Sequence, residues 1–175
     1  MIVTDDDALA DTCRKLRDQG QSSKYMHDLV GFNLRMTEVC AAIGLVQLSK
    51  LEGFLRRRRE TAHYLTERLA GAKGLVPPEE PADRLHAFYQ YIVRVEKFPM
   101  SRDGLVAYLT EHGVGSRPSY PMTVYQQKAL AGQKHRRCAV AERVIPKLLE
   151  LPVHPLVSDA DRETIAQTVL AARSP

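Results

Sequence analysis

Residues 24–48 carry the most information about the architecture of this chain and read KYMHDLVGFNLRMTEVCAAIGLVQL. The second half of this stretch opens a proline-free segment, residues 38–70, in which apolar residues recur mostly at helical spacing. Thr37 can cap the start of this segment, and glycines at 71 and 74 follow its end. We therefore predict one long helix over residues 38–70, or two helices that meet at Gly53.

Upstream of this stretch, the sequence predicts the end of a strand and one helix. Residues 1–4 have strand character, and either Asp6 or Asp7 can cap a helix that runs to Gln19. Acidic residues near its start, basic residues near its end and Gly20 as a stop all support this helix. Residues 21–31 are polar and are expected to be irregular.

Downstream, prolines make residues 73–85 a loop, and residues 88–95 are the best strand candidate because β-branched and aromatic side chains alternate there. Ser101 can cap a helix to Glu111, and Ser158 can cap a last helix to Ala172. Residues 138–149 have helical spacing, whereas residues 114–120 and 151–155 are expected to be extended. The fold class expected is α/β or α+β, with few strands between helices.

Length and composition exclude several classes of protein. A chain of 175 residues fits one domain, with or without a subdomain, and 44% hydrophobic and 26% charged residues exclude disordered, collagen-like and coiled-coil chains. The longest apolar run is far shorter than the roughly 20 residues of a membrane helix. No basic stretch precedes an apolar one at the start, so no export signal is expected. Three widely spaced cysteines indicate reduced thiols and a cytoplasmic location.

The charge pattern argues against nucleic acid as a partner. The net charge of +4 comes from residues 88–175, which hold 12 basic and 8 acidic residues, against 13 of each in residues 1–87. The run Arg56–Arg59 lies in a helical context, where four successive side chains fan around most of a turn instead of forming one flat patch. The glycines never have the spacing of a P-loop, and no two histidines lie four residues apart on one helix, so no metal site is expected.

The stretch quoted above resembles the signature of the pyridoxal-phosphate-dependent sugar aminotransferases of the DegT/DnrJ/EryC1/StrS type, which have the fold type I architecture. The match centres on residues 31–38, followed by the small-residue helix 41–44 and Gln47-Leu48. Further matches follow in order along the chain, at Arg57-Arg58, residues 88–95, Arg102-Asp103, Tyr120-Pro121 and residues 151–155. The resemblance covers essentially the whole chain and implies the carboxyl-terminal portion of such an enzyme.

The resemblance implies a division of the chain and a function. Residues 1–50 are expected to be a remnant of the large cofactor domain, with the dimer-site loop and the start of the long helix, and residues 51–175 the small carboxyl-terminal domain with a small antiparallel sheet flanked by helices. The family transfers amino groups to keto-sugar nucleotides for polysaccharide or antibiotic biosynthesis. The Schiff-base lysine is expected before residue 1, and Lys24 is not expected to replace it.

The resemblance therefore leads to two hypotheses for the function of this chain. In the first, the chain is active only with a complementing amino-terminal portion, pyridoxal 5'-phosphate, a sugar nucleotide and an amino donor, as a homo-oligomer. In the second, it is a truncated, non-catalytic relative that acts as a dimerisation or regulatory module. Neither reading assigns a catalytic residue or a metal to this chain.

The resemblance also assigns site residues. Asn33 matches an asparagine that reaches the cofactor phosphate of the neighbouring subunit, and Arg35 matches an arginine beside the same site, where it can hold substrate phosphate. On the residues alone, Asn33 can equally turn the chain and Arg35 can pair with Glu38. Tyr25 and Tyr120 match aromatics at the sugar end of the pocket.

Two positions depart from the family pattern. Ser119 and Tyr125 replace histidines that usually face the sugar nucleotide in the family, which puts the substrate in question. His154 lies in a Leu-Pro-x-His-Pro turn and is expected to have a structural role.

Overall fold

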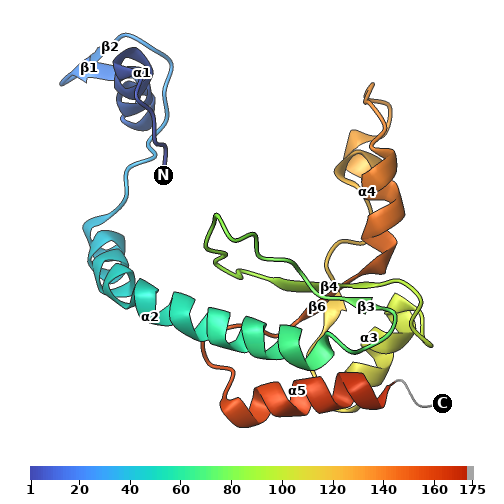
Figure 1. Cartoon of the computed structure of the whole chain (residues 1–175). Helices are drawn as coiled ribbons and strands as arrows, with labels where there is room; N and C mark the ends of the chain where they lie inside the picture. Colours follow the sequence, from blue (N-terminus) through green and yellow to red (C-terminus); the bar gives the residue numbers. More distant parts are fainter. Residues whose placement is uncertain (173–175) are drawn as a thin grey trace. The chain divides into compact units, whose positions relative to one another are not determined.

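The computed structural model describes residues 1–172, which form two compact units (Figure 1). The first unit is Met1–Lys50, the second begins at Leu51, and the boundary lies within one helix. The first unit contains α1 (Asp7–Arg17), the hairpin strands β1 (Gln21–Ser23) and β2 (Met26–His27), and the start of α2 (Glu38–Leu69). None of the helices in residues 1–172 has the length and apolar character needed to cross a membrane.

The second unit contains the remainder of α2 and a small sheet with its covering helices. The strands are β3 (Leu75–Val76), β4 (Tyr91–Val95), β5 (Arg117–Pro118) and β6 (Leu148–Leu151). The α-helices are α3 (Arg102–Glu111), α4 (Ala139–Val144) and α5 (Asp159–Ala171). Short 3-10 turns occupy η1 (Val124–Gln126), η2 (Lys128–Leu130) and η3 (Ile145–Lys147).

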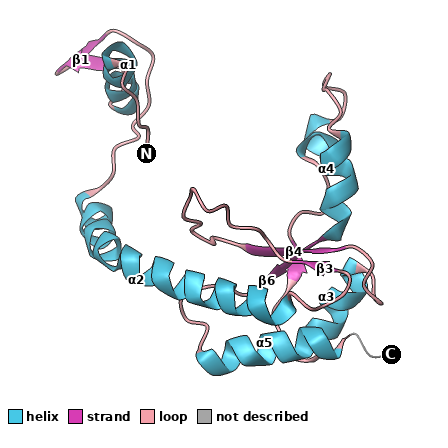
Figure 2. Cartoon of the chain, in the orientation of Figure 1, coloured by secondary structure: helices cyan, strands magenta, loops and turns pink. Residues whose placement is uncertain are grey.

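The four-stranded sheet has the order β3-β4-β6-β5, and each neighbouring pair is antiparallel (Figure 2). In the central pair, Tyr91 lies opposite Leu151 and Val93 opposite Leu149. Alternate residues of β4 are buried, because successive side chains of a strand point to opposite faces. The expected class, a mixed domain with a long helix and a small antiparallel sheet flanked by helices, is confirmed.

The hydrophobic core lies entirely in the second unit, between one face of this sheet and three helices. Fully buried residues come from β4 and β6 and from the inward faces of α2, α3 and α5: Ala62, Leu65, Leu69, Tyr91, Val93, Leu105, Leu109, Leu149, Leu151, Ala166 and Val169. Within the core, the Tyr91 hydroxyl is 2.9 Å from Thr66 Oγ1, and burial raises the pKa of Tyr91 to about 12.

The arginine run stabilises the same unit. Arg58 donates to the carbonyls of Phe88 and Tyr89 at 3.2 and 3.0 Å, and Arg59 donates to the carbonyl of His86 at 3.0 Å. Phe88 is buried with a φ of +43°, a conformation that costs a non-glycine residue about 1–2 kcal/mol. These guanidinium contacts therefore hold a strained turn in place at the entry to β4.

The structure differs from the sequence predictions at several short elements. Residues 1–4 form no strand, since no other described segment pairs with them, and α1 ends at Arg17, two residues early. The hairpin β1–β2 and strand β3 lie in segments predicted to be irregular, and β6 begins within the helix predicted over residues 138–149. Of the predicted strand at 88–95, only residues 91–95 pair, and Tyr89 is exposed.

Candidate functional site

The first candidate site is the loop that links the hairpin to α2. Backbone hydrogen bonds fix this loop to the end of α1: Phe32 donates to Leu16 at 3.0 Å and Leu34 donates to Arg17 at 2.9 Å. Asn33, between them, forms an isolated antiparallel bridge with Asp18. The position of Asn33 is therefore set by the carboxyl-terminal end of α1.

Arg35 joins two residues of this loop junction. Its Nε lies 3.3 Å from Asp18 Oδ1 and 3.3 Å from Asn33 Oδ1, and its backbone N–H is 3.4 Å from the same Asn33 oxygen. The carboxylate that pairs with Arg35 is thus Asp18 and not Glu38, which lies in the first turn of α2. The structure brings Asn33 and Arg35 into direct contact.

This arrangement fits a phosphate group. Because the Asn33 carbonyl oxygen faces Arg35, its amide Nδ2 is directed away and remains a neutral donor. The terminal guanidinium nitrogens of Arg35 also have no hydrogen-bond partner among the described residues, so both side chains retain donors for an anionic oxygen. Asn33 and Arg35 are both exposed, which leaves them accessible to a ligand.

Two lysines near this loop, Lys15 and Lys24, contact carboxylates and an aromatic ring, respectively. Lys15 lies 3.1 Å from Asp11 and 3.3 Å from Asp28, and its hydrogen bonds to these two carboxylates raise its pKa, which favours the charged, non-nucleophilic form. Lys24 Nζ lies 5.2 Å from the centre of the Tyr25 ring, in a cation–π contact. Both lysines near the Asn33–Arg35 pair therefore contact other side chains.

Tyr25 lies in the turn of the β1–β2 hairpin. Its φ is +66°, which is unusual for a residue with a side chain, and its N–H donates to Gln21 Oε1 at 2.9 Å. The side chain is 77% exposed, so this turn directs an aromatic ring into solvent. Strained residues of this kind are enriched at ligand-binding sites.

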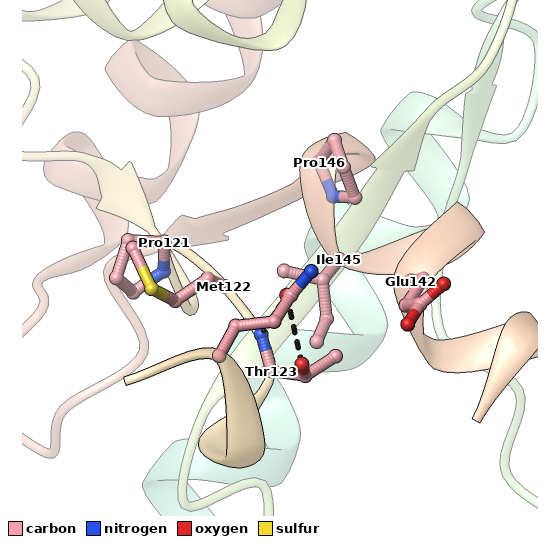
Figure 3. Close-up of a pocket in the computed structure, with 7 residues that line it drawn as sticks. Pro121, Met122, Thr123, Glu142, Ile145 and Pro146 are labelled. Carbon is pink, nitrogen blue, oxygen red and sulfur yellow. Dashed lines mark hydrogen bonds between the residues drawn. The ribbon is translucent and has the colours of Figure 1, made fainter. Parts of the chain in front are cut away.

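Tyr120 belongs to the second unit and lies beside a cavity. Its side chain is 55% exposed, and the residues that follow it line a cavity of about 430 Å³ (Figure 3). The cavity lies between the loop 121–126 and the α4–η3 segment, with apolar walls and three polar residues: Pro121, Met122, Thr123, Gln126, Glu142, Ile145 and Pro146. Ser119, one of the two departures from the family pattern, has a buried Oγ with no hydrogen-bond partner among the described residues.

Tyr125, the other departure, fastens this loop to α4. Its hydroxyl donates to Glu142 Oε1 at 2.9 Å and accepts from the Cys138 N–H at 3.0 Å, while its ring stacks on His135. Arg137 pairs with the same carboxylate through two nitrogens. The Arg137 and Tyr125 hydrogen bonds lower the pKa of Glu142, which keeps the carboxylate ionised and a hydrogen-bond acceptor.

A second, smaller cavity of about 380 Å³ lies at the end of β6, lined in part by Ser116, Arg117, Glu150 and His154. Arg117 and Glu150 form a two-point ion pair with distances of 2.9 and 3.1 Å. Since these two charges satisfy each other, the cavity offers little net charge to a ligand.

Sequence reasoning missed the polar residues of the larger cavity. Thr123 and Gln126 form a capping box at the start of η1, and the pattern Thr-x-x-Gln is a known signal for such a box. Glu142 has no local signal, because its partners Tyr125 and Arg137 lie 17 and 5 residues away.

Comparison with solved structures defines the class of protein. S. venezuelae DesV, solved in complex with a ketimine intermediate, superposes with a TM-score of 0.89 at 27% identity, over 99% of this chain and 46% of DesV. The aminotransferase TlmJ from Streptoalloteichus hindustanus superposes with a TM-score of 0.85 at 32% identity, over 96% of this chain and 45% of TlmJ. The fold is therefore that of part of an aminotransferase.

The sequence comparisons identify the particular family. The model of the DegT/DnrJ/EryC1/StrS aminotransferase family matches residues 1–170, and the chain belongs to this family. It is 34% identical to a "Pleiotropic regulatory protein" of Geobacillus stearothermophilus, over 97% of this chain and 45% of that protein. It is 32% identical to a UDP-N-acetyl-3-dehydro-alpha-D-glucosamine 3-aminotransferase of Acidithiobacillus ferrooxidans, over 97% and 44% of the two chains. The chain thus spans a little under half the length of these relatives.

Proposed function

We propose that this chain is the carboxyl-terminal portion of a pyridoxal-phosphate-dependent aminotransferase that acts on keto-sugar nucleotides in the cytoplasm, and that it needs an amino-terminal portion carrying the Schiff-base lysine. The observation that carries this proposal is the family match over residues 1–170, together with the paired donors of Asn33 and Arg35. The Acidithiobacillus relative, whose name gives a UDP-linked sugar, supports a sugar nucleotide as substrate.

In this function, the chain binds and orients phosphate groups. Asn33 Nδ2 donates to the cofactor phosphate of a neighbouring subunit, and the Arg35 guanidinium holds a second anionic oxygen, while Asp18 fixes the Arg35 side chain. Tyr25 and Tyr120 contribute aromatic surface at the sugar end. Pyridoxal phosphate, when bound, supplies the electron sink for transamination.

The test is complementation. The full chain is mixed with an amino-terminal portion from a family relative, pyridoxal phosphate, glutamate and a UDP-linked keto-sugar, and the amino sugar is measured by mass spectrometry. We expect product only when both portions are present. The absence of product from a mixture that forms a stable complex would contradict the proposal.

The role of Asn33 has its own matched variants. Asn33→Asp keeps the shape of the side chain but replaces the amide donor by a carboxylate that repels phosphate, so we expect cofactor affinity to fall by at least about tenfold. Asn33→Gln keeps the donor and is expected to retain part of the affinity. These affinities are measured on the complex of this chain with the amino-terminal portion. Equal affinity for pyridoxal phosphate in both variants and in the unaltered complex would exclude a contact between Asn33 and the cofactor phosphate.

One observation favours a second candidate function, a non-catalytic dimerisation or regulatory module. Among residues 1–50 only Gly20 is buried, and the large apolar side chains of Val30, Leu45 and Met36 are 70–91% exposed. Apolar surface of this extent is typical of a face that binds another protein chain. Light scattering tests this function by measuring the molar mass of the chain at several concentrations. We expect dimers or larger species, and a monomer at every concentration would contradict the function.

A further inference from the structure

The net positive charge of the chain comes from one stretch of the second unit. Residues 112–141 contain five Lys or Arg residues and no Asp or Glu, whereas the rest of the chain holds 20 basic and 21 acidic residues. This stretch therefore carries more positive charge than the net +4 of the whole chain. Positive charge confined in this way attracts an anionic partner to one place on the molecule.

Three of these five cations form no ion pair among residues 1–172. Arg117 pairs with Glu150, and Arg137 pairs with Glu142. The three cations without an ionic partner are all exposed: Lys128, Lys134 and Arg136. We call residues 128–137 the basic segment, because it contains all three.

The basic segment lies on a protruding part of the second unit. It runs from η2 to the residue before the cap of α4, and every residue from 131 to 137 is exposed. Figure 1 shows this part of the chain (orange) beyond the end of α4 that lies farther from the sheet. The unpaired cations are therefore presented away from the hydrophobic core.

Exposed aliphatic side chains lie on both sides of the basic segment. Val124 in η1 is 71% exposed, and Val140 in α4 is 63% exposed. Each valine lies four residues from an unpaired cation, Lys128 and Arg136 respectively. Cations beside exposed apolar side chains are typical of a surface that binds a membrane, because the cations attract anionic headgroups and the apolar side chains enter the interface.

Nucleic acid fits this surface less well. Proteins that bind single strands stack bases on open aromatic rings. Tyr125 is the one Phe, Tyr or Trp between residues 121 and 141, and its ring already stacks on His135 while its hydroxyl bonds to Glu142. A layer of lipid headgroups requires positive charge but no stacking and no fixed register, so it suits cations spread along an irregular segment.

We propose that the basic segment is a docking surface for an anionic membrane. Lys128, Lys134 and Arg136 contact the phosphate and carboxylate groups of the lipids, and Val124 and Val140 enter the interface. The contact is peripheral, since no helix in residues 1–172 has the length and apolar character to cross a membrane. This inference goes beyond the proposed function, which makes no use of these five residues.

The test is co-sedimentation of the full 175-residue chain with lipid vesicles. Vesicles of phosphatidylcholine are compared with vesicles of phosphatidylcholine and phosphatidylserine in equal parts, at about 0.1 M salt, where charges act over about 10 Å. We expect binding to the anionic vesicles and at least about tenfold weaker binding to the neutral ones. Equal binding to both kinds of vesicle, or no binding to the anionic ones, would overturn the inference.

The decisive variant carries Lys134→Gln and Arg136→Gln together. Each cation near an anionic membrane strengthens binding about fivefold, so the loss of two should weaken it by about thirtyfold. The matched control carries Lys73→Gln and Lys97→Gln, which remove the same charge from exposed positions elsewhere in the second unit and should weaken binding by less than about twofold. All four positions are exposed, so both variants should keep the fold. Equal losses in the two variants would refute the assigned surface.

A competition experiment identifies the class of partner. The chain is offered anionic vesicles together with double-stranded DNA at an equal concentration of negative charge. We expect the chain to sediment with the vesicles, because the two valines add affinity only at a lipid interface. Transfer of the chain to the DNA would overturn the assignment of a membrane as the partner.

Discussion

At the scale of single residues, Arg35 shows how an exposed side chain can be held in place with little effect on stability. Its ion pair with Asp18 is solvent-exposed, with side-chain exposures of 59% and 40%, and such pairs contribute about 0–1 kcal/mol. We therefore expect Arg35→Met to change the free energy of unfolding in urea by less than about 1 kcal/mol, while phosphate-dependent cofactor binding weakens. A large loss of stability would show that Arg35 is chiefly structural.

Glu80 gives a prediction about pH. Its two oxygens accept from the His86 N–H at 2.6 Å and from His63 Nε2 at 2.8 Å, and these bonds lower its pKa. Since the folded pKa lies below the unfolded one, the stabilisation is present above the unfolded value, near 4.3, and is lost as the pH falls.

The matched variants are Glu80→Gln and Glu79→Gln. We expect Glu80→Gln to lower the melting temperature at pH 7 by a few degrees and to have a smaller effect at pH 3, because protonation of Glu80 as the pH falls removes this stabilisation. Glu79 is exposed, and Glu79→Gln should have no effect at either pH. Thermal melts at the two pH values measure both variants, and an equally large drop for Glu80→Gln at pH 3 would contradict this account.

From the sequence, only those residues of the candidate site that lie in a recognised family motif could be predicted. Asn33 and Arg35 lie in the family signature, so the resemblance assigned them, and the structure adds that Asp18 braces Arg35. Gln126 and Glu142 were missed because their significance depends on contacts across a loop, with Tyr125 and Arg137 as intermediaries.

At the scale of elements, helix starts with a capping residue were predicted correctly and short strands were not. Ser101 accepts from the Gly104 N–H and Ser158 from the Asp161 N–H, as their cap patterns indicated, and α2 is continuous through Gly53. The helix predicted over residues 138–149 from its apolar spacing includes the first two residues of β6. Its conformation is set by pairing with β4, more than 50 residues away in sequence.

Helix α2 offers a matched test of burial within one element. Leu65 is fully buried, whereas Leu48, on the same helix, is 64% exposed. We expect Leu65→Ala to lower the free energy of unfolding by about 2–5 kcal/mol through lost apolar burial and the cavity it leaves. Leu48→Ala should change it by less than about 0.5 kcal/mol. Denaturant titration measures both, and losses of similar size would contradict the burial pattern of α2.

At the scale of the whole molecule, the two units differ in what stabilises them. All members of the hydrophobic core lie at or beyond Ala62, while among the described residues of the first unit only Gly20 is buried. The first unit is held by α1, its hairpin and backbone hydrogen bonds, with apolar side chains left exposed. Apolar burial, the main favourable contribution to folding, is thus confined to the second unit.

This distribution predicts that the second unit folds without the first. A fragment that begins at Leu51 retains every core residue, so we expect a cooperative thermal transition within about 5 °C of that of the full chain, and native-like circular dichroism. A peptide of residues 1–50 should show no cooperative transition, because it buries almost no apolar surface. If the Leu51 fragment instead lacked a cooperative transition, apolar contacts made by the first unit would have to contribute to the core, and the confinement of folding energy to the second unit would be wrong.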